Sequence, residues 1–391
     1  MRTNSIESVN IFLESIHKWF NIAEKLDWKS YDPFDFLLSP YLGCIHRNSS
    51  IAARIFVQIG KHSGEKARRL LKIFPHQEAK TISDYLSAAV LLGKSRENWA
   101  LNYFNVLFQK LKDAAVSARH GIGWGLGFPY TSRFADASAK TPNIYTTINA
   151  INSSLDIYEF NGSIDAKKVA REGCRYILEE LGDFQFNGRR WFRYWLGSDV
   201  PIINVQASLA GLFNRAGQIY NNEQYLSLAD ICIDVVLTTQ QSDGSWPYSG
   251  DGKANFVDGF HTGFILQGLM AFKKYSKTNT DEITIAVQRG FEYFKRHLLT
   301  QDAMPRYFAN GKVSMDGQNF AQCIQTCVLC AQREEEIDLA VKIWYKMIDK
   351  NRRNLGLDSG SHETKVSPAI NLRWTVGPAV LATANLINTL V

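Results

Sequence analysis

The sequence predicts an all-α fold, an (α/α)6-type toroid in which helical hairpins form an inner and an outer ring of helices. Three observations lead to this prediction. Apolar residues recur at three- and four-residue spacing in long segments, as amphipathic helices require, and strand-type alternation is rare. Helices of one kind begin at a nearly constant interval. Short and long connections alternate between the helices, which is typical of an array of helical hairpins.

The individual helices follow from the apolar spacing and from residues that favour helix starts. Asp165, Asn222, Asp281 and Asp316 are expected to cap the helices that they precede, because their side chains can accept hydrogen bonds from the first free backbone N–H groups. The expected helices are 4–26, 47–61, 65–74, 78–94, 96–117, 145–160, 165–181, 204–219, 223–240, 259–276, 281–299, 317–333, 335–350 and 376–390.

A repeat organises the larger part of the chain. Helices of one kind begin near Asn143, Asn204, Asp258, Asp316 and Trp374, at intervals of 61, 54, 58 and 58 residues. Each of the first four is joined by a tight turn to a second helix, and a long loop rich in glycine and aromatic residues follows. Self-similarity at such a period indicates stacked supersecondary units, with one functional end on the side of the long loops.

The two kinds of helix differ in composition. Second helices such as residues 165–181 carry charge on one face, as an outer layer should, whereas first helices such as residues 204–219 are apolar or small nearly all round. The first helices are therefore expected to form the inner ring. One domain is predicted over residues 1–391, in which 143–391 form the regular hairpins and the helices of 1–142 complete the ring.

Composition excludes several classes of protein. Lys and Arg exceed Asp and Glu by six in 391 residues, and the basic residues look scattered, which disfavours a nucleic-acid binder. Cys323, Cys327 and Cys330 are spaced along one helix and predict buried reduced thiols better than a zinc site. No metal and no cofactor are expected. The chain offers no signal-peptide core and no membrane-spanning stretch, so a cytoplasmic protein is expected, with its oligomeric state open.

Several segments resemble known families. The stretch YLSLADICIDVVLTTQQSDGSW is similar to the QW repeat of the terpenoid cyclase and protein prenyltransferase toroids. The whole chain resembles bacterial proteins with prenyltransferase-like repeats that accompany surface-polysaccharide genes. The segments that carry this resemblance are YDPFDFLLSP at 31–40, GIGWGLGFPY at 121–130, NVQASLAGL at 204–212 and DGSWPY...DGFHTGF at 243–264.

The resemblance implies a toroid fold that is also used by sugar epimerases, polysaccharide lyases, uronyl C5-epimerases and glycosidases. A role in surface-polysaccharide metabolism is the expectation that follows. A terpenoid cyclase is disfavoured because the DxDD and DDxxD motifs of those enzymes are absent.

The repeat predicts one rim on which polar and aromatic residues converge. Asp258, His261 and Tyr248 are the expected catalytic residues, because Asp258 and His261 are one helical turn apart and the loop carrying Tyr248 precedes them. Aromatic rings, arginines and amides suit a sugar, whose ring faces stack and whose hydroxyls need donors and acceptors. The expected substrate-binding residues are Trp124, Tyr130, Arg133, Arg190, Tyr194, Asn204, Gln206, Trp246, Arg306, Tyr307, Asp316, Asn319, Arg373 and Trp374.

Plainer interpretations stand beside these. Asp258 and Asp316 can be helix caps alone, Trp246 can be a packed residue of the repeat, and His261 can be a structural histidine. Arg133, Arg190, Arg193, Arg306 and Arg373 would give the rim a positive potential and a preference for an acidic oligosaccharide or polysaccharide.

Two reactions fit the residues that are expected on the rim. In the favoured one, a Tyr or His abstracts the C5 proton of a uronate, as in an epimerase or a lyase. In the other, a carboxylate pair, Asp258 with Asp199 or Asp316, hydrolyses a glycosidic bond. A toroid that binds or assembles glycans without catalysis is the third alternative.

Overall fold

The structure is a computed structural model that describes residues 2–43, 49–132, 136–277, 280–357, 367 and 369–391. The described chain is mainly helical, and its only sheets are short and two-stranded. It divides into two compact units. Unit 1 comprises residues 1–180 and 351–391, and unit 2 comprises residues 181–350.

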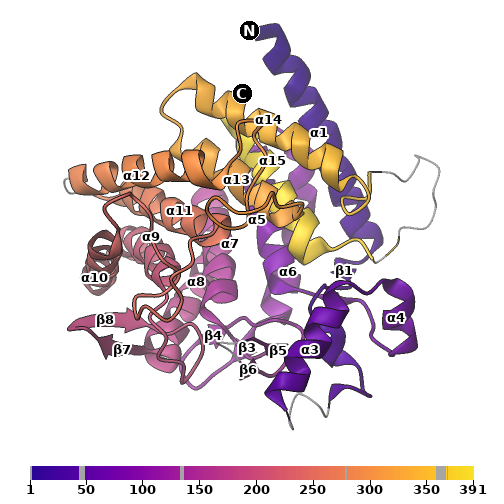
Figure 1. Cartoon of the computed structure of the whole chain (residues 1–391), viewed down its shortest axis with the longest axis horizontal. Helices are drawn as coiled ribbons and strands as arrows, with labels where there is room; N and C mark the ends of the chain where they lie inside the picture. The colour runs from indigo at the N-terminus through magenta and orange to yellow at the C-terminus, as the bar shows by residue number, and fades with distance from the viewer. Residues whose placement is uncertain (1, 44–48, 133–135, 278–279, 358–366, 368) are drawn as a thin grey trace. The chain divides into compact units, whose positions relative to one another are not determined.

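Unit 2 consists of three helical hairpins and a β-hairpin. Its first helices lie side by side, α9 against α11 and α11 against α13, and α9 and α11 also pack against the second helices α10 and α12 (Figure 1). The first helices are α9 (Ile203–Tyr220), α11 (Gly259–Tyr275) and α13 (Gly317–Cys330). The second helices are α10 (Glu223–Thr239), α12 (Asp281–Tyr293) with the π-helical turn η4 (Phe294–Leu298), and α14 (Glu334–Asn351). Strands β7 (Asp183–Phe186) and β8 (Arg189–Phe192) are antiparallel.

Unit 1 repeats this arrangement with helices from both ends of the chain. Helix α5 packs against both α7 and α15, and a further helix flanks each of the three. The central helices are α5 (Ala79–Lys94), α7 (Ile144–Asn161) and α15 (Gly377–Leu390), the last preceded by the π-helical turn η5 (Leu372–Val376). The flanking helices are α1 (Arg2–Lys25), α6 (Phe104–Asp113) and α8 (Ile164–Tyr176), which ends in the π-helical turn η3 (Ile177–Leu181).

Shorter elements of unit 1 connect these helices. Two of them, α3 (Ser50–Lys61) and α4 (Glu65–Leu70), lie between α1 and α5 in the chain. The 3-10 turns are η1 (Asp35–Leu38) and η2 (Asn98–Tyr103). The antiparallel strand pairs are β1–β2 (Lys29–Ser30, His76–Gln77), β3–β4 (Val116–Ser117, Ile122–Gly123) and β5–β6 (Tyr130–Thr131, Asp136–Ala137).

The helix starts confirm two of the four expected caps. The side chains of Asn222 and Asp316 accept hydrogen bonds from the first turns of α10 and α13, as predicted. Two expected caps are wrong. Ser163 caps α8 in place of Asp165, and Thr280 precedes α12, which begins at Asp281 itself. The expected helix 96–117 is also wrong as one element, because η2, α6 and strand β3 divide it.

The first helices are buried because small residues let their backbones approach. A Cβ added at Gly268 of α11 would lie 2.3 Å from the carbonyl oxygen of Ala207, and one added at Gly211 of α9 would lie 2.7 Å from the Cβ of Ala271. Such distances leave no room for a methyl group. Glycine at these positions therefore sets the α9–α11 spacing on which the rest of unit 2 is built.

Substituting Gly268 tests this packing. We expect Gly268→Ala to lower the free energy of unfolding by about 1–3 kcal/mol, because the added methyl group overlaps backbone atoms that cannot move independently. Chemical denaturation monitored by circular dichroism measures the change. Gly64→Ala is the matched control, because a Cβ there meets nothing within 4 Å and the backbone φ is −84°. Equal losses in both variants would contradict the packing argument.

Candidate functional site

Asp258 and His261 form a hydrogen-bonded pair at the start of α11. Asp258 is the N-cap, and its Oδ1 accepts a hydrogen bond from the backbone N–H of His261 at 2.8 Å. The imidazole Nδ1 lies 2.8 Å from Oδ1 and 2.7 Å from Oδ2 of the same carboxylate. The Asp258 side chain is 2% exposed and that of His261 is 30% exposed. A carboxylate accepts, so Nδ1–H donates to it, and Nε2 is left as the basic ring nitrogen.

Aromatic rings surround the exposed edge of this pair. The Tyr248 ring packs edge-on against His261 with centroids 4.5 Å apart, and Phe256 stacks on Tyr248 at 5.0 Å. Backbone hydrogen bonds hold the loop in place, from the Tyr248 N–H to the Phe256 carbonyl at 3.1 Å and from the Gly259 N–H to the Tyr307 carbonyl at 3.1 Å. The structure therefore brings together the three side chains that the sequence predicted to be catalytic.

A polar seam continues from this pair between α11 and α13. The Asn319 Nδ2 donates to the Arg306 carbonyl at 3.0 Å, and the glycines of α11 leave space for amides of α13. A Cβ at Gly259 would lie 2.7 Å from Asn319 Oδ1, and one at Gly263 would lie 2.5 Å from Gln322 Nε2. These two amide atoms are buried without a hydrogen-bond partner among the described residues. Such atoms retain their capacity to bind water or a ligand.

Three residues expected to bind substrate have packing roles instead. Trp124 and Trp246 are buried, and each donates its Nε1–H to a helix carbonyl, of Leu111 at 2.8 Å and of Val236 at 2.9 Å. Gln206 is also buried and bonds both backbone groups of Phe192 with its side-chain amide. A side chain whose polar atoms are satisfied inside the protein has no group left for a sugar, so these expectations are corrected.

The arginines expected to make the rim positive have different surroundings. Three of the described arginines are paired with carboxylates, Arg190 with Asp183 at 2.5 Å, Arg193 with Asp199 at 2.7 Å and Arg373 with Asp32 at 2.6 Å. Pairing with a carboxylate weakens the positive field of these three arginines. Arg133 lies outside the described residues.

Arg306 differs from these arginines, because its hydrogen bond is to the carbonyl of Gly311. Its Nε is buried without a hydrogen-bond partner among the described residues. Because a carbonyl leaves the charge of the guanidinium in place, Arg306 is better suited to an acidic group than the three arginines paired with carboxylates.

The other expected residues of unit 2 have mixed surroundings. Tyr307 is 36% exposed and lies edge-on to Phe260 and Phe308. Tyr194 lies beside Trp195, with ring centroids 5.5 Å apart. Asn204 is buried, and its Oδ1 lacks a hydrogen-bond partner among the described residues. Asp316 caps α13 by accepting the Gln318 N–H at 3.0 Å, which supports the plainer interpretation of this residue.

Unit 1 gathers the remaining expected residues around one buried ion pair. The Arg373 guanidinium donates to both oxygens of Asp32, at 2.6 and 2.8 Å. It also lies 5.2 Å from the ring centre of Trp374 and 5.8 Å from that of Phe34. Phe34 packs edge-on against Tyr130 at 6.3 Å. The half-buried rings of Phe34, Tyr130 and Trp374 thus form an aromatic surface above a fixed cation.

More buried charges surround this ion pair, and sequence reasoning missed them. Lys80 and Asp84 are 2.6 Å apart within α5, and burial raises the pKa of the Asp84 carboxyl although Lys80 opposes the shift. His76 lies 3.1 Å from Glu78, whose oxygens both accept from the Gly127 N–H. Burial alone would lower the pKa of His76, but the contact with Glu78 outweighs it and raises the pKa to about 9.

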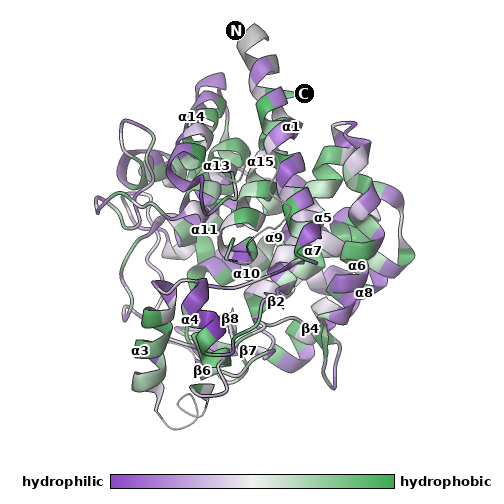
Figure 2. Ribbon diagram, turned by 90° about the vertical axis from the view of Figure 1, so that its right-hand side faces the viewer, coloured by the Kyte–Doolittle hydropathy of each residue, from purple (hydrophilic) through white to green (hydrophobic). Residues whose placement is uncertain are grey.

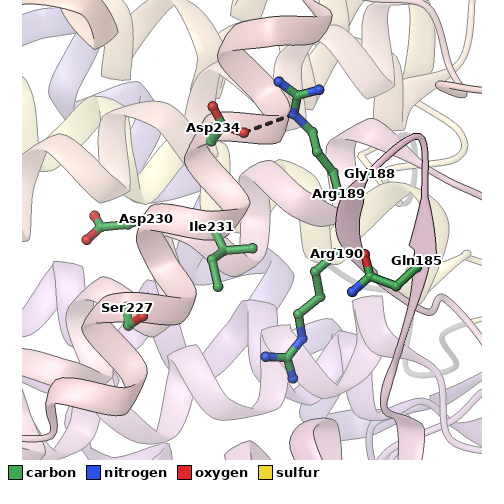
Figure 3. A pocket seen from close by; sticks show the side chains of 8 residues that line it. All are labelled: Gln185, Gly188, Arg189, Arg190, Ser227, Asp230, Ile231 and Asp234. Carbon is green, nitrogen blue, oxygen red and sulfur yellow. Dashed lines mark hydrogen bonds and ion pairs between the residues drawn. The ribbon is translucent and has the colours of Figure 1, made fainter.

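An open groove of about 510 Å³ lies elsewhere in unit 2, between the β7–β8 hairpin and α10 (Figure 3). Of the expected site residues it contains only Arg190. The Arg189–Asp234 ion pair spans it at 2.9 Å. The remaining lining residues are Gln185, Gly188, Ser227, Asp230 and Ile231. The groove is not the place where the predicted catalytic side chains meet.

The cysteines confirm the expectation of buried thiols. Cys323, Cys327 and Cys330 are buried along α13 and form no disulfide. Burial raises the pKa of all three, that of Cys330 to about 12, so they are neutral thiols. The described residues contain no group of three or more His, Cys, Asp or Glu side chains placed to bind a metal ion. In the described part of the chain, no helix is both long and apolar enough to span a bilayer.

The fold and the polar helix starts define a protein of the α/α toroid class, and comparison with solved structures agrees. No family model matches the chain, and no curated protein matches it in sequence. A cellobiose 2-epimerase from Spirochaeta thermophila superposes with a TM-score of 0.58 at 13% identity, over 80% of this chain and 85% of that one.

Two further solved structures extend the comparison. A cellobiose 2-epimerase from Bacillus thermoamylovorans gives a TM-score of 0.59 at 11% identity, over 81% of this chain and 90% of that one. A family 76 glycoside hydrolase (mannosidase) from Bacteroides thetaiotaomicron gives 0.51 at 13% identity, over 80% and 86%. At these identities the likeness shows the fold, and it confirms the all-α, (α/α)-toroid prediction.

The His76–Glu78 contact predicts a pH-dependent stability. The pKa of His76 in the folded protein, about 9, exceeds its ordinary value of 6.5. The stabilisation is therefore complete below pH 6.5 and is lost as the pH rises through 9. Urea denaturation is expected to show that the free energy of unfolding of the wild type falls by on the order of 3 kcal/mol as the pH rises across this range. In the variants His76→Gln and Glu78→Gln, the free energy of unfolding should depend less on pH. If it changes with pH equally in all three proteins, the His76–Glu78 ion pair is refuted.

Proposed function

We propose that this protein is a carbohydrate-active enzyme that removes a proton from a sugar carbon next to a carbonyl group, an epimerase or lyase acting on a uronate-containing glycan at C5. The observation that supports it is the Asp258–His261 pair, with both carboxylate oxygens on Nδ1 and a partly exposed imidazole. A histidine held by a carboxylate in this way is a general base near neutral pH. No cofactor or metal enters the proposal.

Each residue then has a defined role. Asp258 fixes the imidazole and stabilises the imidazolium that forms when Nε2 takes the C5 proton. Arg306 is the group that would neutralise the uronate carboxylate as charge develops on it. Tyr248, in edge contact with His261, would lie on the same side of the sugar as the base and hold the imidazole in position. Return of the proton to the opposite face of C5 inverts the centre, whereas expulsion of the C4 substituent gives the unsaturated product of a lyase.

The geometry supports this reaction better than hydrolysis by paired carboxylates. Both oxygens of Asp258 are engaged by His261, so Asp258 is not placed to protonate a leaving group or attack a sugar. Of the two candidate partners, Asp199 is held by Arg193 and Asp316 by the first turn of α13. A glycosidase needs one carboxyl free to act as acid and a second free to act as base or nucleophile.

A second candidate is proton abstraction at C2 of a reducing-end sugar. Two observations favour it. Arg190, Arg193 and Arg373 are paired with carboxylates, which weakens the case for an acidic substrate. Two of the solved structures with this fold are named as cellobiose 2-epimerases. The open-chain aldehyde acidifies C2 as a carboxylate acidifies C5, so the same His261 base would serve.

Deuterium exchange in heavy water tests both candidates in one assay. The purified protein is incubated with uronate-containing oligosaccharides and, separately, with reducing disaccharides, and proton NMR follows the signals of C5 and C2. We expect exchange at C5, and we expect His261→Ala and Asp258→Asn to slow it by about 10²- to 10⁴-fold with smaller changes in binding. Asparagine also caps helices well, so Asp258→Asn removes the charge and keeps the cap.

The controls separate catalysis from folding. His297→Ala removes a histidine whose Nδ1 contacts Asn310 and should exchange at the parent rate. Cooperative melting of every variant shows that each is folded. Exchange at C2 alone would transfer the proposal to the second candidate. Parent-rate exchange in both Asp258 and His261 variants would reduce the pair to a helix cap, and cleavage without exchange would favour a glycosidase.

A further inference from the structure

The positive charge of the chain is concentrated in one segment of unit 1. Residues 41–75 contain seven Lys and Arg against a single acid, Glu65, a net charge of +6. The whole chain also has a net charge of +6, so the remaining residues hold 37 bases and 37 acids. The composition suggested that the basic residues are scattered, but the excess of basic over acidic residues lies in this one segment. The excess charge belongs to α3, α4 and their connections.

Helix α3 is apolar on two opposite faces. Ala53, Val57 and Gly60 are buried, and the first two pack with Leu37 in a small core. Residues advance by about 100° around a helix, so positions 51, 55 and 59 form a stripe roughly opposite to this face. That stripe consists of Ile51, Ile55 and Ile59, which are 64%, 55% and 49% exposed. One face thus holds the helix on unit 1, and an isoleucine stripe faces outward.

The neighbouring part of the segment adds exposed apolar and basic side chains. Leu70 and Phe74 are 80% and 75% exposed, and Tyr41 is exposed as well. Figure 2 shows the contrast between α3, largely in hydrophobic colours, and the hydrophilic α4. The exposed basic residues are Lys61, Lys66, Arg69 and Lys72. Large exposed apolar side chains that cluster among basic ones mark an interaction surface.

We propose that the α3–α4 segment, residues 49–75, docks on the surface of an anionic lipid bilayer. Isoleucine, leucine and aromatic side chains would enter the boundary between headgroups and acyl chains, and the lysines and arginines would contact lipid phosphates. This is binding in the plane of the interface, which requires no membrane-spanning helix. The proposal is independent of the sugar chemistry of unit 2.

The charge argues for a bilayer over other occupants of this surface. Two copies of the chain would bring two segments 49–75 together, each with six Lys and Arg against one Glu, a net charge of +5, and like charges across a desolvated contact repel. A nucleic acid would pair with the basic residues but would leave the isoleucine stripe in water. An anionic membrane satisfies both features, because it offers apolar depth and negative charge in one surface.

Vesicle flotation tests the proposal. The full-length protein is mixed with vesicles of phosphatidylcholine alone or with about one third phosphatidylglycerol, and the bound fraction is measured at low and high salt. We expect binding to the anionic vesicles, weakened several-fold by salt. The triple variant Ile51→Ser, Ile55→Ser, Ile59→Ser should bind at least about tenfold more weakly, because three apolar insertions are lost. Replacing Lys61, Lys66 and Lys72 with Gln should reduce binding to anionic vesicles in particular.

A matched control uses exposed isoleucines elsewhere in the chain. Ile164 and Ile285 are 73% and 54% exposed, and their replacement by Ser should leave vesicle binding unchanged. All variants change exposed side chains, and circular dichroism checks their folding. The proposal is overturned if the wild type binds no anionic vesicles or if the triple variant binds like the wild type. It is also overturned if sedimentation shows a dimer that the triple variant loses while vesicles bind neither protein.

Discussion

The ion pair between Asp32 and Arg373 is the contact on which unit 1 depends. It joins segments 341 residues apart and is almost fully buried, with both oxygens of Asp32 engaged by the guanidinium. Removing one partner of a buried pair typically costs about 3–5 kcal/mol, because the other charge is left without compensation. Asp35 and Arg68 form a second buried pair nearby in the chain, 2.8 Å apart. The segment 31–40 therefore holds two acids that are fixed by arginines from other parts of unit 1.

The helices could be predicted because their signals are local. Each first helix of the repeat is apolar nearly all round, and caps such as Asn222 and Asp316 act within one turn, so the spacing revealed both the elements and the hairpin array. Asp165 was misassigned because Ser163, two residues earlier, is an equally good cap. The pairing of Asp32 with Arg373 left no such signal, since no periodicity relates residues that are 341 positions apart in the chain.

In the site, too, contacts between residues close in sequence could be predicted, whereas contacts between distant residues could not. His261 could be placed against Asp258 because a separation of three residues at a helix start fixes their geometry. Trp124 and Trp246 were misassigned because their direction depends on loop backbone that periodicity does not describe. Gln206 was misassigned because its partner, the backbone of Phe192, comes from the β-hairpin that precedes α9. The same limit applies to Asp84, which with Lys80 looks like an ordinary surface ion pair along a helix although both side chains are buried. It also applies to Glu78, which is buried beside His76. Burial of a charge is a tertiary property, and one sequence does not reveal it.

The discontinuous course of unit 1 has a consequence for the order in which the protein is made. Unit 2 is one continuous stretch, residues 181–350, and is complete before the last segment leaves the ribosome. Unit 1 lacks Arg373 and helix α15 until then. Its first 180 residues must wait through the synthesis of unit 2 with the buried face of α5 uncovered and Asp32 without its partner. During that interval the first 180 residues expose apolar surface, so this is when the nascent chain is most open to aggregation and to chaperones.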